Sequence, residues 1–255
     1  MEIKHNSIVC GDNVEVLKQI PDQHFDLTVT SPPYDALRAY GGHTWDFDGL
    51  SEQLVRVTKD GGVIVWVVAD GTVDGSETLT SFRQAIHFSE LGMRVHDTMI
   101  YEKSGVSYPD SNRYLQVSEW MFVFSKGKPK TVNLLRDRPN KYVGTMGGNH
   151  RGGLCKRGEF GIRFNIWRYA NGRDNSSKDR SAFKHPAIMP EALAKDHILS
   201  WSNPGDLVLD PFAGSGTTLK MAKLTGREYF GIEINPDYVK ITEDRLKTQQ
   251  TLFNV

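Results

Sequence analysis

Residues 207–218 read Leu-Val-Leu-Asp-Pro-Phe-Ala-Gly-Ser-Gly-Thr-Thr, and this stretch decides the fold. A short apolar run ends in Asp210, a turn with two glycines follows, and an amphipathic segment begins at Thr217. This order predicts a buried strand, a tight turn and a helix. The glycines let the backbone of the turn approach a ligand closely, and the first amides of the helix are free to bind it.

A glycine turn between a strand and a helix is weak evidence alone, so the following strand matters. Residues 229–234, Tyr-Phe-Gly-Ile-Glu-Ile, predict a strand that carries Glu233 at its end. A carboxylate in that place can accept hydrogen bonds from both hydroxyl groups of a ribose. NAD would suit this geometry, but the Gly-x-Gly-x-x-Gly pattern is not met because residue 219 is leucine. We therefore expect a nucleoside cofactor that has no pyrophosphate.

Apolar strands alternate with amphipathic helices along most of the chain, which predicts an α/β fold with a doubly wound, mostly parallel sheet. The expected strands cover residues 7–10, 25–30, 63–68, 94–102, 120–124, 206–210 and 229–234. The expected helices cover residues 14–20, 50–58, 78–91, 190–200, 219–224 and 237–249. The continuous apolar run at 63–68 indicates a central strand, and the strands at 94–102 and 120–124 are expected at the sheet edge, with antiparallel pairing as one option.

A second motif follows the strand at 25–30 and reads Thr30-Ser31-Pro32-Pro33-Tyr34. Open α/β sheets bind their ligands at the carboxyl ends of the strands, where this motif begins. The two prolines remove two N–H donors and leave carbonyl acceptors beside a hydroxyl group and an aromatic ring. Such a set of groups suits a ligand that carries an amino group.

The two motifs together resemble a known family. Residues 210–218 with Gly231-Ile-Glu, preceded in the chain by Ser31-Pro-Pro-Tyr, resemble the S-adenosylmethionine-dependent DNA amino-methyltransferases. The order of the motifs resembles the permuted β-type subgroup, and the resemblance covers residues 5–125 and 184–247. It implies a Rossmann-like sheet of the seven-stranded type with an inserted target-recognition region.

The resemblance implies a role for each matching residue. The methionine part of the cofactor is assigned to the turn and its neighbours: Asp210, Phe212, Ala213, Gly214, Ser215, Gly216 and Thr217. Glu233 is assigned to the ribose, Ile234 to the adenine ring and Asp12 to the adenine amino group. His185 and Pro186 belong to a segment that precedes the cofactor motif in the family and closes over the methionine end.

The resemblance also implies a direct methyl transfer to an exocyclic amino nitrogen. The target base leaves the duplex stack, Tyr34 stacks on it, and the Pro32 carbonyl and Ser31 hydroxyl accept from its amino group, with Pro33 stiffening the motif. Cys10 and Cys155 do not follow a proline, which excludes the cytosine-C5 class with its Pro-Cys nucleophile. Serine at position 31 is typical of cytosine N4 as the target, whereas Asp or Asn there is typical of adenine N6, the second candidate.

The charge of the chain is zero overall but unevenly distributed. Residues 126–184 carry 15 basic and four acidic residues, a charge of +11, which leaves 16 basic and 27 acidic residues, −11, in the rest. Aromatic residues lie among these cations: Tyr142, Phe160, Phe164, Trp167 and Tyr169. This mixture predicts a DNA-binding insertion rather than a solvated loop. The candidate DNA contacts are Arg136, Arg138, Lys141, Arg151, Lys156, Arg157, Arg163, Arg168 and Arg173.

The predicted organisation is a catalytic half at 1–125, the basic insertion at 126–184 and a cofactor-binding half at 185–255. Double-stranded DNA is the expected partner, a homodimer is an option, and no metal or membrane is expected. The longest apolar run, 63–69, is too short to span a bilayer, and two cysteines make no disulfide framework, so a cytoplasmic, site-specific enzyme of a restriction-modification kind is expected. RNA methylation and a DNA-binding module without activity stay as alternatives, while the order of the motifs disfavours a protein-glutamine methyltransferase.

Overall fold

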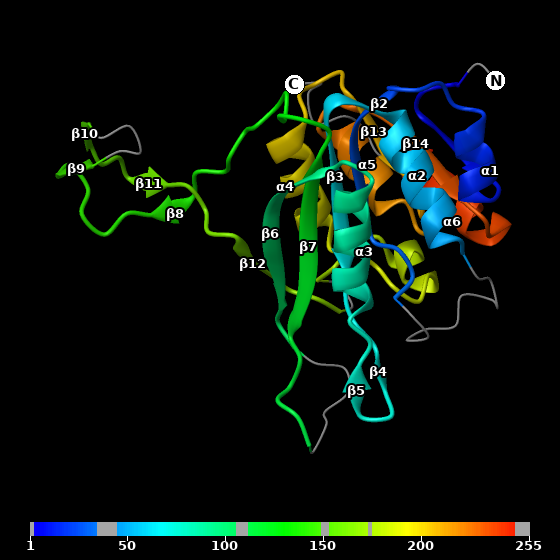
Figure 1. Cartoon of the computed structure of the whole chain (residues 1–255), viewed down its shortest axis with the longest axis horizontal. Helices are drawn as coiled ribbons and strands as arrows, with labels where there is room; N and C mark the ends of the chain where they lie inside the picture. The colour runs from blue at the N-terminus through cyan, green and yellow to red at the C-terminus, as the bar shows by residue number, and fades with distance from the viewer. Residues whose placement is uncertain (1–2, 35–44, 106–111, 149–152, 173–174, 248–255) are drawn as a thin grey trace.

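The computed structural model describes residues 3–34, 45–105, 112–148, 153–172 and 175–247. Its centre is an eight-stranded sheet with the order β1-β14-β13-β2-β3-β7-β6-β12 (Figure 1). These strands are β1 (Ser7–Cys10), β2 (Phe25–Thr30), β3 (Thr58–Val68), β6 (Arg94–Lys103), β7 (Ser118–Ser125), β12 (Ile166–Tyr169), β13 (Leu207–Asp210) and β14 (Glu228–Glu233). β7 is antiparallel to its neighbours β3 and β6, and the other seven run in one common direction.

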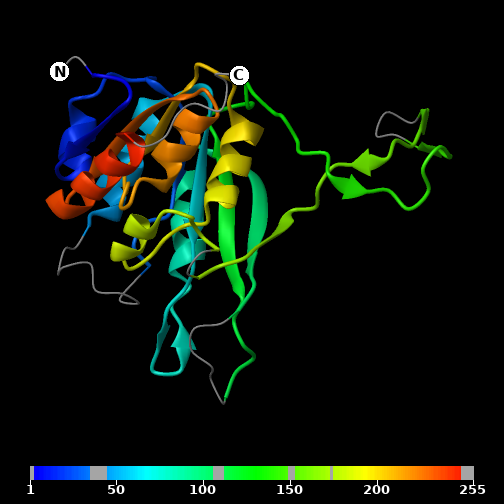
Figure 2. The same cartoon turned by 180° about the vertical axis from the view of Figure 1, so that it is seen from behind.

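Helices cover both faces of this sheet (Figure 2). One face packs against α1 (Asn13–Lys18), α2 (Phe47–Val57) and α3 (Thr80–Glu90), and the other against α4 (Glu191–Trp201), α5 (Thr217–Leu224) and α6 (Pro236–Lys247). Alternate residues of β3 enter the two cores, with Val65 on the α4 side and Trp66 on the α3 side, both fully buried. The continuous apolar run of β3 is therefore explained by burial on both faces.

The predicted α/β class and the doubly wound, mostly parallel sheet are confirmed. Each predicted strand and helix is present, with ends that shift by a few residues; residues 248 and 249 of the last helix lie outside the described residues. The edge was wrongly predicted, because β6 does not end the sheet. β12, from within the basic stretch, pairs in parallel with β6 and makes an eighth strand.

The position of β12 also corrects the interpretation of the aromatic residues in the basic stretch. Trp167 is buried in the core, where its ring lies 4.5 Å from that of His197, and Tyr169 packs partly against the same core. These two rings were expected among the DNA-facing aromatics. Their packing against the core assigns them to the sheet instead. Trp167 and Tyr169 are alternate residues of β12, and alternate residues of a strand point to the same face of the sheet.

An arm formed by residues 136–148 and 153–164 projects from the sheet (Figures 1 and 2). It contains two small antiparallel pairs, β8 (Arg138–Pro139) with β11 (Phe160–Gly161), and β9 (Met146–Gly148) with β10 (Leu154–Lys156). A separate short hairpin, β4 (Thr72–Val73) with β5 (Ser76–Glu77), extends from the end of β3. No helix among the described residues is long and apolar enough to cross a membrane.

Candidate active site

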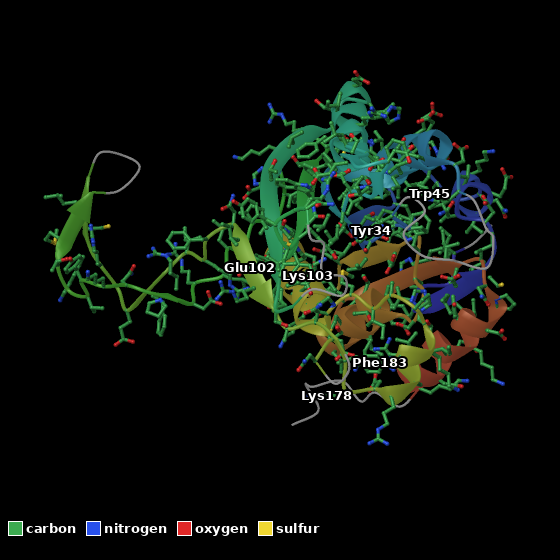
Figure 3. All side chains as sticks on the ribbon, turned by 90° about the horizontal axis from the view of Figure 1, so that it is seen from below. Tyr34, Trp45, Glu102, Lys103, Lys178 and Phe183 are labelled. Atoms are coloured by element: carbon green, nitrogen blue, oxygen red, sulfur yellow. The ribbon has the colours of Figure 1, made fainter. Side chains whose placement is uncertain are left out.

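A pocket of about 750 Å³ opens at the carboxyl ends of the parallel strands. Its lining includes the residues that follow β1, β2, β3, β13 and β14, together with Glu119 near the start of β7. Glu119 reaches this edge because β7 runs in the opposite direction to the other strands. Figure 3 views the molecule from this edge, with Tyr34, Lys103 and Phe183 around the pocket. The sheet thus gathers groups from distant parts of the chain at one edge, where α/β proteins bind ligands.

The glycine turn after β13 is built around Gly214. The Gly214 N–H donates to Glu233 Oε2 at 2.8 Å, and its carbonyl accepts from Thr242 Oγ1 at 2.9 Å. A Cβ at Gly214 would lie 2.9 Å from His185 Nε2, and its φ of +51° also favours glycine. The turn therefore brings His185 and Glu233 against the same backbone atoms, and any side chain at position 214 would separate them.

Asp210 lies at the end of β13 and is buried. Its Oδ1 accepts from Thr30 Oγ1 at 2.7 Å and from the Phe212 N–H at 3.1 Å. Burial raises the pKa of Asp210 to about 6, although these hydrogen bonds act in the opposite direction. A positively charged group in the pocket would be stabilised by this carboxylate, since little water screens it.

The segment that carries His185 is attached to the body by a cluster of four charges, of which the two cations are buried. Asp179 and Glu191 each form ion pairs with both Lys220 of α5 and Arg245 of α6, at 2.8 to 3.0 Å. Arg245 also donates to the Ser215 carbonyl of the glycine turn. The cluster joins the turn, two helices and the segment before His185 into one unit.

The pocket beside the turn has the features of a site for a cationic nucleoside cofactor. Acidic groups line it, including Asp12, Asp210 and Glu233. The hydroxyl of Thr217 is buried and has no hydrogen-bond partner among the described residues, so a ligand could satisfy it. Phe212 lines the same pocket and meets Trp45 edge to face, with ring centroids 5.1 Å apart.

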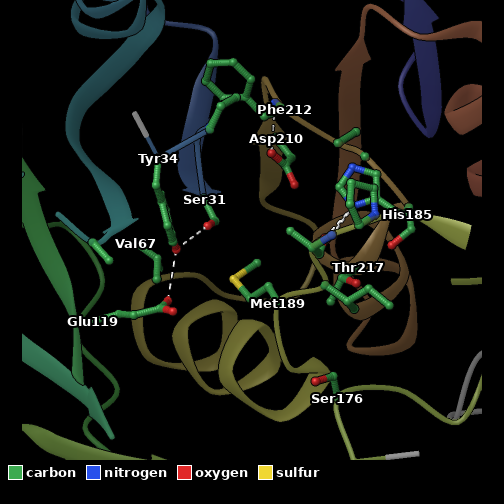
Figure 4. Close-up of a pocket in the computed structure, with 18 of the residues that line it drawn as sticks. Ser31, Tyr34, Val67, Glu119, Ser176, His185, Met189, Asp210, Phe212 and Thr217 are labelled. Atoms are coloured by element: carbon green, nitrogen blue, oxygen red, sulfur yellow. Dashed lines mark hydrogen bonds between the residues drawn. The ribbon is translucent and has the colours of Figure 1, made fainter. Parts of the chain in front are cut away.

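The Ser-Pro-Pro-Tyr motif lies across the pocket from the glycine turn (Figure 4). Ser31 Oγ is 2.7 Å from Tyr34 Oη, and Tyr34 Oη donates to Glu119 Oε2 at 3.0 Å. Lys103 Nζ lies 3.2 Å from the other carboxylate oxygen of Glu119. The motif and the glycine turn therefore line one pocket. The family resemblance predicts such an arrangement, because the target base and the methyl donor have to bind next to each other.

The chain matches, over residues 25–244, a family model described as DNA methylase (N6_N4_Mtase). The chain belongs to this DNA methylase family. The orphan methyltransferase M.BamHII of Bacillus amyloliquefaciens is 56% identical over 244 residues, covering 90% of this chain and 91% of that protein. Membership in the family establishes the enzyme class, a DNA methyltransferase of the amino-methylating kind.

Solved structures share the fold of this DNA methylase. The PvuII DNA methyltransferase, described as cytosine-N4-specific, has a TM-score of 0.73 at 20% identity and covers 99% of this chain and 88% of its own. A putative DNA modification methylase of Thermus thermophilus, TTHA0409, solved with S-adenosyl-L-methionine, has a TM-score of 0.65 at 24% identity, with coverage of 94% and 92%. At these identities the likeness concerns the fold.

Most of the sequence-predicted site residues of the DNA methylase come together in the pocket. Those that line it are Ser31, Pro33, Tyr34, Asp12, Asp210, Phe212, Ala213, Gly214, Ser215, Thr217, Glu233, Ile234, His185 and Pro186. Pro32 is buried behind the lining, and Gly216 is the αL residue before α5, where a Cβ would lie 2.5 Å from Thr242 Cγ2. Gly216 therefore shapes the turn, and the roles of the individual residues toward ligands stay predictions.

The candidate DNA contacts of the methylase divide into exposed and engaged side chains. Arg136, Lys141, Lys156 and Arg157 are exposed on the arm, whereas Arg151 and Arg173 lie outside the described residues. Arg168 of β12 is exposed and donates to Glu102, and Arg138 packs over the ring of Phe164. Arg136, Lys141, Lys156 and Arg157 therefore form the free cationic surface of the described arm.

Arg163 was expected to contact DNA, and its surroundings favour a different role. Its guanidinium pairs with Asp137 and Asp196, donates to Tyr169 Oη and lies 5.0 Å from the ring centre of Trp167. These contacts occupy its donors and tie the base of the arm to β12 and α4. We therefore infer that Arg163 attaches the arm to the body and does not contact DNA, because a guanidinium between two carboxylates presents no free charge to a phosphate.

Several lining residues of the methylase pocket were not predicted. Glu119, Lys103, Trp45 and Tyr238 all face the pocket, and the Tyr238 ring packs edge to face against His185 at 4.5 Å. An antiparallel β7 was one option in the sequence, and that orientation would have directed attention to Glu119 at its start. The others follow from packing between segments that are remote in sequence.

Proposed function

We propose that this DNA methylase transfers the methyl group of S-adenosyl-L-methionine to the exocyclic N4 of cytosine within a specific sequence of double-stranded DNA. Ser31 carries the proposal. It is the first residue of the Ser-Pro-Pro-Tyr motif, its hydroxyl lines the pocket, and serine in that position is typical of family members that act on cytosine N4.

S-adenosylmethionine fits the groups that line the pocket. Asp12 and Glu233 offer carboxylates at the ends of β1 and β14, which suits the amino group of adenine and the hydroxyls of ribose. Asp210 and the free hydroxyl of Thr217 suit the charged methionine part. When bound, the cofactor supplies an electrophilic methyl group on a sulfonium centre.

The protein has to make a weak nucleophile reactive. The lone pair of an exocyclic amine is delocalised into the base, and acceptors for its hydrogens favour the tetrahedral form in which the lone pair can attack. Ser31 Oγ and the Pro32 carbonyl are candidate acceptors, and the Tyr34 ring offers a surface on which the extruded base can stack. The pocket holds these groups in place before the base enters.

DNA would approach from the side of the arm and the pocket mouth. The exposed cations Arg136, Lys141, Lys156 and Arg157 support contacts to phosphates along the arm. Aromatic residues of the arm, including Tyr142 and Phe164, are exposed and can meet bases or sugars. The ranges 1–125, 126–184 and 185–255 remain our proposed division, with β12 as a strand that the insertion returns to the sheet.

Adenine N6 is the second candidate target, because the matching family model covers both N6 and N4 methylases. The deciding experiment incubates unmethylated genomic DNA with the protein and labelled S-adenosylmethionine, then separates the nucleosides. We expect label in N4-methylcytosine, and label in N6-methyladenine would refute the choice of base. Single-stranded DNA and RNA at equal phosphate concentration are the substrate controls, and Ser31→Ala is expected to lose most of the transfer.

A further inference from the structure

The hydroxyl groups of Ser31 and Tyr34 form a chain that ends at a carboxylate outside the motif. Tyr34 Oη donates to Glu119 Oε2 at 3.0 Å and lies 2.7 Å from Ser31 Oγ (Figure 4). Glu119 comes from β7, more than 80 residues after the motif, and its side chain is 15% exposed. Nothing in the two sequence motifs gives this carboxylate a role.

Counting protons sets the direction of this chain. A phenol has one proton, and Tyr34 donates it to Glu119. The hydrogen bond between Tyr34 and Ser31 must then use the Ser31 proton, so Ser31 donates to Tyr34 Oη. The Ser31 oxygen keeps its lone pairs and has no proton left to direct into the pocket.

Glu119 can impose this direction only while it is ionised, because a carboxylate accepts and never donates. Lys103 Nζ lies 3.2 Å from Glu119 Oε1, and both side chains are largely shielded from solvent. The Lys103 cation therefore lies against the carboxylate in a place where water screens charges little. Lys103 is the last residue of β6, whose end meets the start of β7 at the pocket.

We propose that Glu119 is a positioning residue for methyl transfer: through Tyr34 it turns the Ser31 hydroxyl proton away from the substrate, so that Ser31 receives the target amino group as a pure acceptor. The inference rests on the role that the proposed function gives to Ser31. An exocyclic amino group presents two protons, so a serine that donated into the pocket would oppose it. Cytosine N4 and adenine N6 both carry two protons, so the same arrangement of Ser31 suits either target.

The test compares Glu119→Gln, Tyr34→Phe and the double variant. A glutamine keeps the size of the side chain but can donate, so it no longer imposes one direction; Tyr34→Phe keeps the ring and removes the relay. We expect the single-turnover rate of methyl transfer to genomic DNA to fall about 10- to 100-fold in each variant, the scale of one lost hydrogen bond to a charged group. The Kd for S-adenosylmethionine and for DNA should stay within about twofold.

The double variant separates positioning from a merely structural effect. Once Tyr34→Phe has removed the hydrogen bond to Glu119, adding Glu119→Gln should lower the single-turnover rate little further. If the two substitutions acted independently on the structure, their fold-losses in rate would multiply in the double variant. Glu90→Gln on the exposed side of α3 is the matched control and should transfer at the wild-type rate. A Glu119→Gln protein with the wild-type rate, or with losses that multiply in the double variant, overturns the inference. Failure of the wild-type protein to label cytosine overturns the proposed target base instead.

Discussion

Asp210 is a buried carboxylate that ends β13 and faces the pocket. The fold offers it two hydrogen bonds, from Thr30 and Phe212, but burial outweighs them and raises its pKa to about 6. A residue selected for stability alone would not be a charged group in this place. We propose that this carboxylate serves a cationic ligand, because water would screen the attraction between the two charges very little.

The raised pKa of Asp210 gives a pH-dependent prediction for Asp210→Asn. From about pH 4 to pH 6 the folded protein binds more protons than the unfolded chain, so Asp210 costs stability as the pH rises and the cost is complete above pH 6. Asparagine keeps an acceptor for Thr30 and Phe212 without the charge. We expect Asp210→Asn to raise the free energy of unfolding by on the order of 2 kcal/mol at pH 7.5, and by little at pH 4.

Urea denaturation at the two pH values measures this difference. Asp244→Asn on the exposed surface of α6 is the control and should show no such dependence. An equal effect of Asp210→Asn at both pH values would contradict the prediction. Binding of S-adenosylmethionine should weaken in Asp210→Asn in spite of the added stability.

At the scale of elements, the four charges of Asp179, Glu191, Lys220 and Arg245 hold the glycine turn and the His185 segment together. Burial raises the pKa of Asp179, but hydrogen bonds from Lys220 and Arg245 outweigh it and hold that pKa below its usual range. The side chain of Arg245 is 1% exposed, so water and dissolved ions screen its ion pairs very little. Removing one member leaves the other three paired but with one uncompensated charge, which is strongly destabilising in a place that is largely shielded from water.

We therefore expect Arg245→Met to lower the free energy of unfolding by about 3 kcal/mol. It should also weaken S-adenosylmethionine binding, since Arg245 supports the Ser215 carbonyl of the turn. Lys247→Met on the same helix, whose exposed partner is Asp244, should change stability by less than about 0.5 kcal/mol. Chemical denaturation of both variants checks the prediction, and equal effects would contradict it.

The elements around the cofactor turn could be predicted because their signals are local. The apolar run before Asp210, the two glycines and the start of α5 at Thr217 follow one another in the chain. β12 could not be predicted, since its four residues lie among cations and Trp167 is buried only because β6 provides a partner. Glu119 was not predicted as a pocket residue for a related reason, because its position at the pocket depends on the direction of β7.

At the scale of the whole molecule, much of the basic stretch of the sequence forms an arm that projects from the rest of the protein. The arm carries the exposed cations Arg136, Lys141, Lys156 and Arg157, and it projects away from a body that is acidic overall (Figure 1). Tyr142, Val143, Met146, Leu154 and Phe160 are exposed on the arm, and the part of it that the structure describes contains no buried hydrophobic residue. Its cations suit the phosphates of duplex DNA, and its apolar side chains can contact sugars and base edges in the grooves.

The arm gives a prediction about salt. Lys141 and Lys156 are exposed, so replacing both by glutamine should reduce the slope of log K against log salt concentration for DNA binding by about 2. Lys18→Gln is the control, because α1 lies at the opposite end of the molecule from the arm (Figure 1) and Lys18 is paired with Glu15. Titrations by fluorescence anisotropy between 50 and 200 mM salt, the range in which about 6 to 10 phosphate contacts change affinity ~10³- to 10⁵-fold, measure the slope. An unchanged slope would remove the arm from the DNA interface.

The central position of β13 has a consequence for biosynthesis. β2 is an inner strand only because β13 lies beside it, and β1 joins the sheet only through β14. While a ribosome is still translating the first two hundred residues, β2 therefore has a bare edge, and β1 has nothing to pair with. Bare edges invite pairing with other chains, and non-local pairs form slowly. The nascent protein should therefore depend on chaperones until residues 207–233 emerge, and fragments that stop earlier should aggregate.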